Sequence, residues 1–453
     1  MSTAAPSPQT MQTHSKPASV GIAVGIGNFL EWYDFAVYGF LAVIIGKLFF
    51  ASDDPVVSTL SSLGVFAIGF FFRPLGGFIL GPIGDRWGRR VALAISITAM
   101  GLATVLIGFL PTYAAIGVGA PVLLVALRAL QGLSAGGEWT GAATYLVEGA
   151  PTNKRARYAS IVSATAGFAT ASGSFLALLL TSVLTTEQMN DFGWRIPFWL
   201  AAPMIIIGLI LRFRLEESPV FTALREKHTV AKSPFKGLLR DWKPMLLTLA
   251  FGAVHGTGYY YLSTFTVNYL QVTIGMEAKE ALLIVGSCLA IYTVFCVVAG
   301  WVVDKVGRRV PNLIAMAGYV VLSIPAFMLM ATGETLLVYA GILLIAAVQC
   351  LASVTCVVLL VELYPADSRS SASAIGFNIA IAFISGPAPY IGAWLALTFA
   401  SSVAPAYFLV VISLVAFIVL ARWLPETKGR NLFAVDGETP EPAAPARVEE
   451  RSR

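Results

Sequence analysis

Long apolar runs alternate with short polar segments along almost the whole chain. A helix needs about 20 apolar residues to cross a bilayer, and twelve runs reach that length. Six precede a central polar stretch, at about Val20–Phe50, Val57–Ile83, Val91–Leu110, Pro121–Gly149, Tyr158–Leu184 and Trp194–Leu211. Six follow it, at about Met245–Val272, Ala281–Val303, Pro311–Ala331, Thr335–Tyr364, Ser371–Ala400 and Val403–Trp423. The pattern predicts an all-α integral membrane protein with twelve transmembrane helices in two sets of six.

Polar segments flank these two sets and separate them. The first 18 residues are rich in Pro and Ser and have no apolar core, so they are not a cleaved signal peptide. From their composition we expect the last residues to be disordered. We therefore expect five parts, namely an N-terminal tail (1–18), a six-helix bundle (19–213), a central loop (214–243), a second bundle (244–424) and a C-terminal tail (425–453).

The basic residues predict how the chain is oriented. Lys and Arg are enriched in loops on the cytoplasmic side of a membrane. If the N-terminus is cytoplasmic, 25 of the 30 Lys and Arg residues fall in inside segments, and Lys47, Arg195 and Lys279 lie at outside ends. Both tails and the central loop are therefore expected in the cytoplasm.

The composition agrees with a membrane location. Hydrophobic residues make up 57% of the chain and charged residues 12%, against about 25% charged residues in soluble domains. The mean hydropathy is +0.78. The net charge of +5 then reflects the sidedness of the loops and does not indicate a nucleic-acid partner. We expect a multi-pass protein of the plasma (inner) membrane that is surrounded by the lipid bilayer.

No pattern for metal, cofactor or covalent chemistry is visible. The four cysteines lie inside apolar runs without ligand spacing, and the three histidines are scattered. Neither a nucleotide-binding loop nor a nucleophile–His pair occurs. We expect no enzyme activity, no cofactor and no metal site.

A charged pattern, G-x-x-x-D-[RK]-x-G-R-R, occurs in both halves. The first copy runs from Gly81 to Arg90 and the second from Gly300 to Arg309, displaced by 219 residues. A second correspondence, at an offset of 214, relates Glu148, Pro151 and Arg155 to Glu362, Pro365 and Arg369. Such duplication is typical of a transporter built from two homologous half-bundles. We expect the two glutamates to brace loop arginines rather than to contact substrate.

Ionisable residues inside the apolar runs are the main candidates for chemistry, because a charge at mid-membrane costs about 2.5–3.5 kcal/mol. In the first run, Glu31, Asp34 and Tyr38 share one helix face. In the fourth run, Arg128, Gln131 and Glu138 share another. We expect Glu31, Asp34 and Arg128 to form one charged cluster, in which Arg128 could bind an anionic group through its planar fork while a carboxylate carries a proton. The alternative is a self-neutralising buried ion pair that sets helix register.

The second half offers polar residues at membrane depth. His255 and Tyr259 share a face of the seventh run, and Tyr261 lies on an adjoining face. These tyrosines suit a cavity of hydroxyl donors, or else an interfacial aromatic belt. Asn378 and Gln349 are either cavity residues or hydrogen-bonding contacts between helices. For Arg73, in the second run, we expect a snorkelling or gating role.

These motifs resemble the major facilitator superfamily from about Val20 to Leu432. The duplicated loop pattern and the R-x-x-Q-G series at Arg128 resemble that superfamily's signatures. GNFLEWYDFAVYG, GFFFRPLGG, QGLSAGGEW, FGWRIPF and LEESPVF together resemble the metabolite:proton symporter family. That family includes permeases for α-ketoglutarate, citrate, shikimate, and proline or betaine.

The resemblance implies two six-helix bundles around a central cavity, alternating access and uptake driven by protons. Three roles follow for the candidate residues. Substrate binding is assigned to Arg128, Gln131, Tyr38, Tyr259, Tyr261 and Asn378. Proton coupling is assigned to Asp34, Glu31 and Glu138, and gating to Asp85, Arg86, Arg89, Asp304 and Arg308.

The function expected from these observations is proton symport of a small organic acid by a monomer. A di- or tricarboxylate such as α-ketoglutarate is the leading substrate class. Uptake of a zwitterion such as proline or betaine, or of a cyclic acid such as shikimate, is the alternative within transport. A membrane sensor that kept the fold without transporting is a third hypothesis.

Overall fold

The structure is a computed structural model that describes residues 17–50, 52, 54–87, 89–213, 242–366 and 369–432. Helices form every regular element within these residues. Those of the first half are α1 (Pro17–Phe40), α2 (Ala42–Phe49), α3 (Pro55–Phe71), α4 (Arg73–Trp87), α5 (Arg89–Phe109), α6 (Tyr113–Ile116), α7 (Gly119–Ala135), α8 (Glu138–Glu148), η1 (Thr152–Lys154), α9 (Arg155–Val183), α10 (Thr186–Asp191), η2 (Gly193–Arg195), α11 (Ile196–Trp199) and α12 (Ala201–Phe213).

The second half repeats this series of long helices. Its elements are α15 (Trp242–Tyr260), η3 (Tyr261–Phe265), α16 (Thr266–Tyr269), η4 (Leu270–Ile274), α17 (Ala278–Val306), α18 (Arg309–Met330), α19 (Thr335–Glu362), α20 (Arg369–Ala380), η5 (Ile381–Ser385), α21 (Ala388–Thr398) and α22 (Ala404–Trp423). The segments η3, η4 and η5 are π-helical.

The twelve predicted spans all correspond to helices. Among the described residues, nine helices are long and apolar enough to cross a membrane. The first span is a pair, Gly25–Phe40 and Ala42–Phe49, bent by 62°. The third is the shorter apolar helix Ala94–Phe109. The seventh is α15, which continues through η3, α16 and η4. The predicted all-α membrane fold is confirmed.

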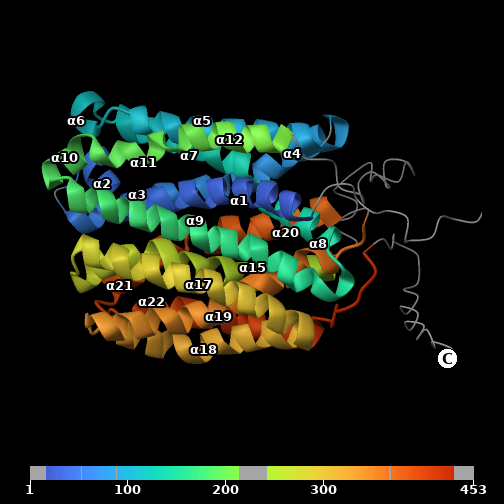
Figure 1. Cartoon of the computed structure of the whole chain (residues 1–453). Coiled ribbons are helices and arrows are strands. Elements are labelled where there is room, and N and C mark those ends of the chain that lie inside the picture. Colours follow the sequence, from blue (N-terminus) through green and yellow to red (C-terminus); the bar gives the residue numbers. More distant parts are fainter. Residues whose placement is uncertain are drawn as a thin grey trace, which may run out of the picture.

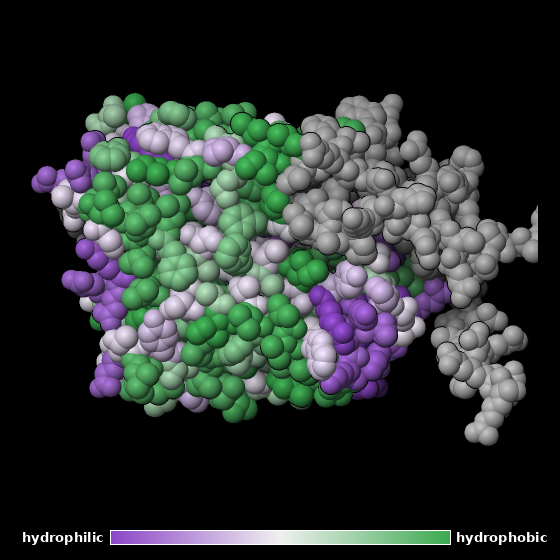
Figure 2. Space-filling model, in the orientation of Figure 1, coloured by the Kyte–Doolittle hydropathy of each residue, from purple (hydrophilic) through white to green (hydrophobic). Residues whose placement is uncertain are grey.

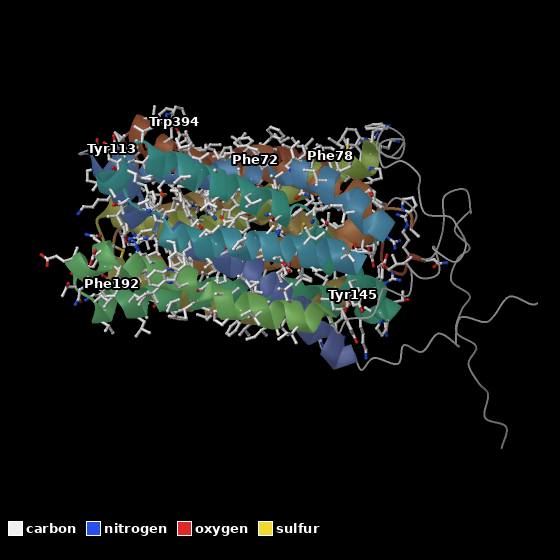
Figure 3. All side chains as sticks on the ribbon, turned by 90° about the horizontal axis from the view of Figure 1, so that it is seen from above. Phe72, Phe78, Tyr113, Tyr145, Phe192 and Trp394 are labelled. Carbon is white, nitrogen blue, oxygen red and sulfur yellow. The ribbon has the colours of Figure 1, made fainter. Side chains whose placement is uncertain are left out.

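The two halves form two bundles whose helix axes lie roughly parallel to one another (Figure 1). Most helices of the first half lie in the upper part of the view and most of the second half in the lower part, while α20 lies at the level of α1 and α8. At one end lie the helix termini around Arg155, Arg308, Arg309 and Arg369, and we call this the basic end. Figure 3 shows Tyr145 near that end, and Tyr113 and Phe192 at the opposite, far end.

A broad apolar surface covers the face of the molecule seen in Figure 2, between these ends. Long apolar side chains on this surface are exposed, among them Leu179, Val294 and Ile418. Hydrophilic residues gather at the two ends of the same view. Such a band, far larger than the apolar patches of soluble monomers, matches a lipid environment.

The predicted fourth span breaks into α7 and α8 at Gly136–Gly137. Glycine tolerates the irregular backbone at such a break. A carbonyl freed from helical bonding inside a membrane requires another donor. Asn378 of α20 supplies it, because its side-chain Nδ2 donates to the carbonyl oxygen of Gly136. A hydrogen bond from the second bundle therefore stabilises a break in the first.

Glycines also set the distance between α3, α4 and α7. A Cβ built on Gly132 would lie 1.7 Å from the carbonyl oxygen of Gly69, and one on Gly76 would lie 1.8 Å from that of Leu133. Small residues are what allow helix backbones to approach this closely in a membrane. The close packing brings the charged residues of α4 and α7 toward α1.

Parts of the expected organisation lie outside the described residues. These are most of the N-terminal tail, the central loop from 214 to 241, and residues 433–453. The expected C-terminal tail, by contrast, begins with a folded segment. Residues 425–432 cross the basic end, and Leu432 is buried. Their side chains bind charged groups there, a tertiary effect that polar composition does not reveal.

We predict that Gly132→Ala destabilises the protein. The added methyl group would force α3 and α7 apart, and overpacking of this kind costs about 1–3 kcal/mol. The melting temperature of the purified protein should fall. The matched control is Gly141→Ala in α8, where a Cβ has nothing within 4 Å. Equal melting temperatures for the two variants would contradict the close packing.

Candidate functional site

Arg128 of α7 belongs to a buried cluster of four side chains. Its Nη1 lies 3.4 Å from Asp34 Oδ2 of α1 and donates to Gln131 Oε1 at 2.8 Å. Gln131 Nε2 and Thr104 Oγ1 of α5 donate to Asp34 Oδ1 at 2.8 and 2.6 Å. The Arg128 and Asp34 side chains are 1% and 3% exposed. The structure therefore brings together Asp34, Arg128 and Gln131, and adds Thr104.

Arg128 retains donors that this cluster does not use. Its Nε and Nη2 are buried and have no hydrogen-bond partner among the described residues. Its Cζ lies 3.8 Å from the ring centroid of Tyr38, whose hydroxyl donates to the Ser62 carbonyl at 3.2 Å. The aromatic face stabilises the cation without occupying its donors. A carboxylate could bind those two nitrogens side by side.

Glu31 has a different partner from the one expected. Arg73 of α4 donates through Nη2 to Glu31 Oε1, and also to the Ala135 carbonyl at 3.1 Å. The expectation of one cluster containing both acids and Arg128 is therefore corrected: each acid of α1 has its own arginine. Breaking a buried ion pair leaves an unpaired charge, at about 3–5 kcal/mol. Arg73 is buried in this pair and does not snorkel to the surface.

Glu138 lies at the start of α8, beside the break at Gly136–Gly137. Ser96 Oγ of α5 lies 3.4 Å from Glu138 Oε2 and 2.5 Å from the carbonyl oxygen of Ser134. The Glu138 side chain is buried. The structure thus separates Glu138 from the contacts of Asp34 and places it where α5, α7 and α8 meet.

An aromatic group lies between the two bundles, and we call it the aromatic wall. It consists of Trp32, Trp139, Tyr259 and Tyr260. Trp32 of α1 has its ring centroid 4.5 Å from Tyr259 and 5.3 Å from Trp139. The indole nitrogens of both tryptophans are buried and have no hydrogen-bond partner among the described residues.

The aromatic wall continues to the charged cluster. The ring centroid of Tyr260 lies 5.8 Å from that of Phe66, and Arg128 Cζ lies 5.5 Å from the same Phe66 ring. On the other side, Tyr259 Oη and Thr170 Oγ1 are 2.7 Å apart. Both tyrosines come from α15 of the second bundle. The N-terminal charge cluster and the C-terminal bundle are therefore connected through aromatic rings.

Three candidates from the second half occupy other places. Tyr261 begins the π-helical segment η3, and its hydroxyl donates to the Pro405 carbonyl at 3.2 Å inside the second bundle. Gln349 accepts from Tyr319 and lies 3.1 Å from His255 Nδ1. Asn378 contacts the α7–α8 break.

Residues of the second copy of the duplicated pattern form contacts between the two bundles at the basic end. Asp304 accepts from the backbone N–H groups of Ala156 and Arg157 at 2.9 and 3.2 Å, at the N-terminus of α9. A carboxylate there interacts favourably with the helix dipole and the unpaired N–H groups. Arg308 Nη1 lies 3.7 Å from Asp304 and its other nitrogens donate to Glu362 at 3.0 and 3.1 Å. Asp304 thus joins the second bundle to the first.

The second internal correspondence forms two ion pairs that cross between the bundles. Arg155 of α9 pairs with Glu362 of α19 at 3.3 Å. Arg369 of α20 pairs with Glu148 of α8 at 2.7 Å. The glutamate of each half therefore binds the arginine of the other half. Both pairs close the basic end in this conformation.

The folded segment at 425–432 lies across these ion pairs. Thr427 Oγ1 donates to Glu362 at 2.6 Å, and the Arg430 carbonyl accepts from Arg155 at 2.7 Å. Burial raises the pKa of Glu426, but the backbone N–H groups of Arg308, Lys428 and Arg309 outweigh it and leave the pKa below its usual value. Glu426 therefore binds as a carboxylate at neutral pH.

The remaining gating candidates, Asp85, Arg86 and Arg89, have side chains outside the described residues. Their backbone places them where α4 ends and α5 begins. Within the described residues, no group of three or more His, Cys, Asp or Glu side chains could hold a metal ion.

Sequence reasoning missed the two tryptophans of the aromatic wall. Each follows a glutamate that was singled out, in the pairs Glu31–Trp32 and Glu138–Trp139. The repeated Glu-Trp dipeptide was the available signal. Thr104 carried none, because a lone threonine in an apolar run is common.

Comparison with known proteins decides the family. The family model of the Major Facilitator Superfamily matches residues 24–387. The chain belongs to the major facilitator superfamily. The predicted family resemblance is thereby confirmed, and the protein is a transporter rather than an enzyme.

Curated relatives in this superfamily match over most of the chain. The proline/betaine transporter of Salmonella typhimurium is 35% identical, covering 92% of this chain and 85% of the relative. The glycine betaine/proline/ectoine/pipecolic acid transporter OusA of Dickeya dadantii is 33% identical, covering 92% and 84%. The ectoine/proline transporter ProP of Corynebacterium glutamicum is 34% identical, covering 89% and 83%.

Solved structures share the fold at low sequence identity. The proton:xylose symporter XylE bound to 6-bromo-6-deoxy-D-glucose matches with a TM-score of 0.75 and 19% identity, covering 92% of this chain and 98% of that chain. The inward open conformation of XylE from E. coli matches over the same shares at 19% identity, with a TM-score of 0.65. These likenesses concern the fold.

We predict that Glu362→Gln opens the basic end. The change leaves buried Arg155 without an acidic partner among the described residues, and Arg308 with only Asp304 at 3.7 Å, so conformations that hydrate these arginines gain population. Electron–electron distances between spin labels on Asn153 and Arg422, which are both exposed, should show an added longer component.

The matched control is Glu426→Gln. Glu426 accepts from the backbone N–H groups of Arg308 and Arg309 in the second bundle and of Lys428 in its own segment, and so its loss should leave the distance between bundles unchanged. An unchanged distance distribution in Glu362→Gln would show that this residue does not hold the basic end closed.

Proposed function

We propose that this transporter takes up a zwitterionic compatible solute, of the betaine or proline type, together with a proton. The observation that carries the proposal is the pairing of unused Arg128 donors with an aromatic wall nearby. The names of the relatives from three bacteria point to the same substrate class. The sequence analysis gave this substrate class as the alternative to a di- or tricarboxylate. The names of the relatives favour the alternative.

A zwitterion has the two groups that this site can bind. Its carboxylate fits Nε and Nη2 of Arg128, which present a planar fork. Its quaternary or secondary ammonium group fits the faces of Trp32 and Tyr260, where cation–π attraction contributes about 0.5–2 kcal/mol. The ring of Phe66 lies between Arg128 and Tyr260 and gives the intervening carbon atoms an apolar contact.

A di- or tricarboxylate, the leading expectation from sequence, fits less well. Each additional carboxylate needs another cation at membrane depth. Among the described residues in the interior, Arg73 already pairs with Glu31 and Arg128 with Asp34. The aromatic wall adds no positive charge. A cyclic acid such as shikimate remains compatible with Arg128 but leaves the cation–π faces unused.

Proton coupling is assigned to Asp34. A substrate carboxylate on Nε and Nη2 of Arg128 shares the single positive charge of the guanidinium with Asp34, whose Oδ2 contacts Nη1. Because two carboxylates beside one cation in a buried place repel each other, Asp34 takes up a proton and becomes neutral. Thr104 and Gln131 continue to hold its other oxygen. Substrate binding and proton binding then favour each other, which is the requirement for symport.

We infer that the basic end faces the cytoplasm of a bacterial inner membrane, since basic loops stay on that side. One proton entering with a neutral zwitterion moves one positive charge inward. At 100 mV this gains about 2.3 kcal/mol, enough for about 50-fold accumulation. Every group of the proposed site lies in one chain, so a monomer suffices.

We predict that betaine and proline exchange through the wild-type protein in liposomes, whereas α-ketoglutarate and citrate exchange weakly. In a counterflow assay, radiolabelled betaine should accumulate transiently, and a protonophore should abolish steady-state accumulation. Exchange of citrate or α-ketoglutarate with no exchange of betaine would overturn the proposed substrate class. No exchange of any solute would favour the sensor hypothesis.

Two variants distinguish the parts of the site in the same assay. Arg128→Lys keeps the charge but loses the planar fork, so affinity for every substrate with a carboxylate should fall by at least about tenfold. Trp32→Leu should weaken betaine binding by about two- to thirtyfold and affect an uncharged competitor less. Equal losses for both ligand types in Trp32→Leu would assign Trp32 to packing instead.

We predict that Asp34→Asn abolishes proton-driven accumulation and retains substrate exchange. Asparagine mimics the protonated carboxyl at nearly constant volume and can still accept from Thr104 and Gln131. Counterflow and proton-driven uptake should be compared in the same liposomes. Glu31→Gln is the matched control, since it neutralises the other acid of α1 and leaves Arg128 untouched. If Asp34→Asn still concentrates substrate and Glu31→Gln does not, the proton site is Glu31.

A further inference from the structure

The surface between α9 and α17 carries an apolar stripe that ends in cations. On α17, Val294, Val297 and Trp301 follow each other at helical spacing, and Lys305 comes one turn later at the basic end. The two valines and Trp301 are 61%, 55% and 51% exposed. On α9, Phe168 is 58% exposed. This stripe is part of the apolar surface that faces the bilayer.

Two cations from different bundles lie against one exposed indole. Lys305 Nζ is 4.1 Å from the Trp301 ring centroid, and Arg157 Cζ of α9 is 4.9 Å from it. Arg157 lies 3.6 Å from Asp304, whose carboxylate Arg308 also shares. Lys305 forms no ion pair within the described residues. The two cations therefore exceed the negative charge beside them, and an anion between them would relieve their repulsion.

The place of these cations identifies the kind of anion. Hydrophilic residues gather over the ends of α17 and α18, where the apolar band stops (Figure 2). Tryptophan favours this boundary, and basic pockets between helices on the cytoplasmic side bind anionic headgroups. A free phosphate ion would use the two cations and leave the apolar stripe above them unexplained. A phospholipid uses both.

We propose that an anionic phospholipid binds on the surface where α9 and α17 pack together. Its phosphate lies between Arg157 and Lys305 beside the Trp301 ring, and an acyl chain follows Val297 and Val294 toward Phe168. Because α9 belongs to the first bundle and α17 to the second, the lipid contacts both at the end where Asp304 joins them. Bound lipid therefore favours the conformation with the basic end closed.

The test measures retention of phosphatidylglycerol by the full-length protein. Native mass spectrometry of protein taken from mixed phosphatidylglycerol and phosphatidylcholine nanodiscs should show preferential retention of the anionic lipid. Lys305→Gln should weaken that retention about fivefold, as expected for one basic residue near the surface. Lys305→Arg should restore it, since the charge remains.

The matched control is Lys243→Gln. Lys243 Nζ lies 5.6 Å from the ring of Trp242, which is 52% exposed, but no second cation contacts that ring among the described residues. This variant removes one cation beside one tryptophan and leaves every residue of the proposed lipid site unchanged. Equal retention by Lys305→Gln and wild type, or equal loss in Lys243→Gln, would overturn the site. Retention of phosphatidylcholine as strong as that of phosphatidylglycerol would also overturn it.

A second measurement separates lipid binding from a structural contact between Lys305 and Trp301. Phosphatidylglycerol should raise the melting temperature of wild type above its value in phosphatidylcholine alone, and Lys305→Gln should lose most of this increase. If Lys305→Gln lowers the melting temperature equally in both lipids, the contact is structural and the proposal is wrong. Displacement of retained lipid by millimolar inorganic phosphate would assign the cations to a free anion instead.

Discussion

The cost of a charge in a medium that cannot hydrate it organises this protein. Arg128 and Arg73 are both nearly inaccessible, so each must have an acid within reach. Asp34 and Glu31 supply these acids from neighbouring turns of α1, and this fixes how α1 sits against α4 and α7. The close glycine contacts of α3 and α4 with α7 make that distance possible. The same pairing leaves Nε and Nη2 of Arg128 without a hydrogen-bond partner among the described residues.

In the described structure the two bundles contribute different kinds of side chain to the interior. The first contributes the charges of the interior, and the second contributes aromatic and hydroxyl groups from α15. At the basic end the acids come from both bundles: Asp304 and Glu362 of the second bundle receive donors from the first, and Glu148 of the first pairs with Arg369 of the second. Movement of one bundle relative to the other must therefore exchange buried donors at one end while keeping Arg128 and Asp34 intact. That separation allows access to change without dismantling the interior cluster.

The architecture was predictable from the sequence because apolar length and duplicated motifs are local signals. The pairing of Arg128 with Asp34 was also within reach, since few partners exist at that depth. The partner of Glu31, the position of Tyr261 and the contact of Asn378 were not. Each depends on a contact between different elements: Arg73 with Glu31, Tyr261 with the Pro405 carbonyl, and Asn378 with the break after Gly136. Helical spacing within one element cannot predict such contacts, and composition cannot reveal that 425–432 folds back onto Glu362.

The crossed ion pairs of the basic end have a consequence for the origin of the chain. Glu148 binds Arg369, and Arg155 binds Glu362, while Glu148 and Arg155 correspond to Glu362 and Arg369 by position in their halves. Such an exchange is isologous, the relation found in two-fold symmetric homodimers. A single half-length polypeptide carrying one glutamate and one arginine would thus be complementary to a second copy of itself. Fusion of two such copies would have required no new contact to hold this end together, and the present asymmetry of the interior could then evolve afterwards.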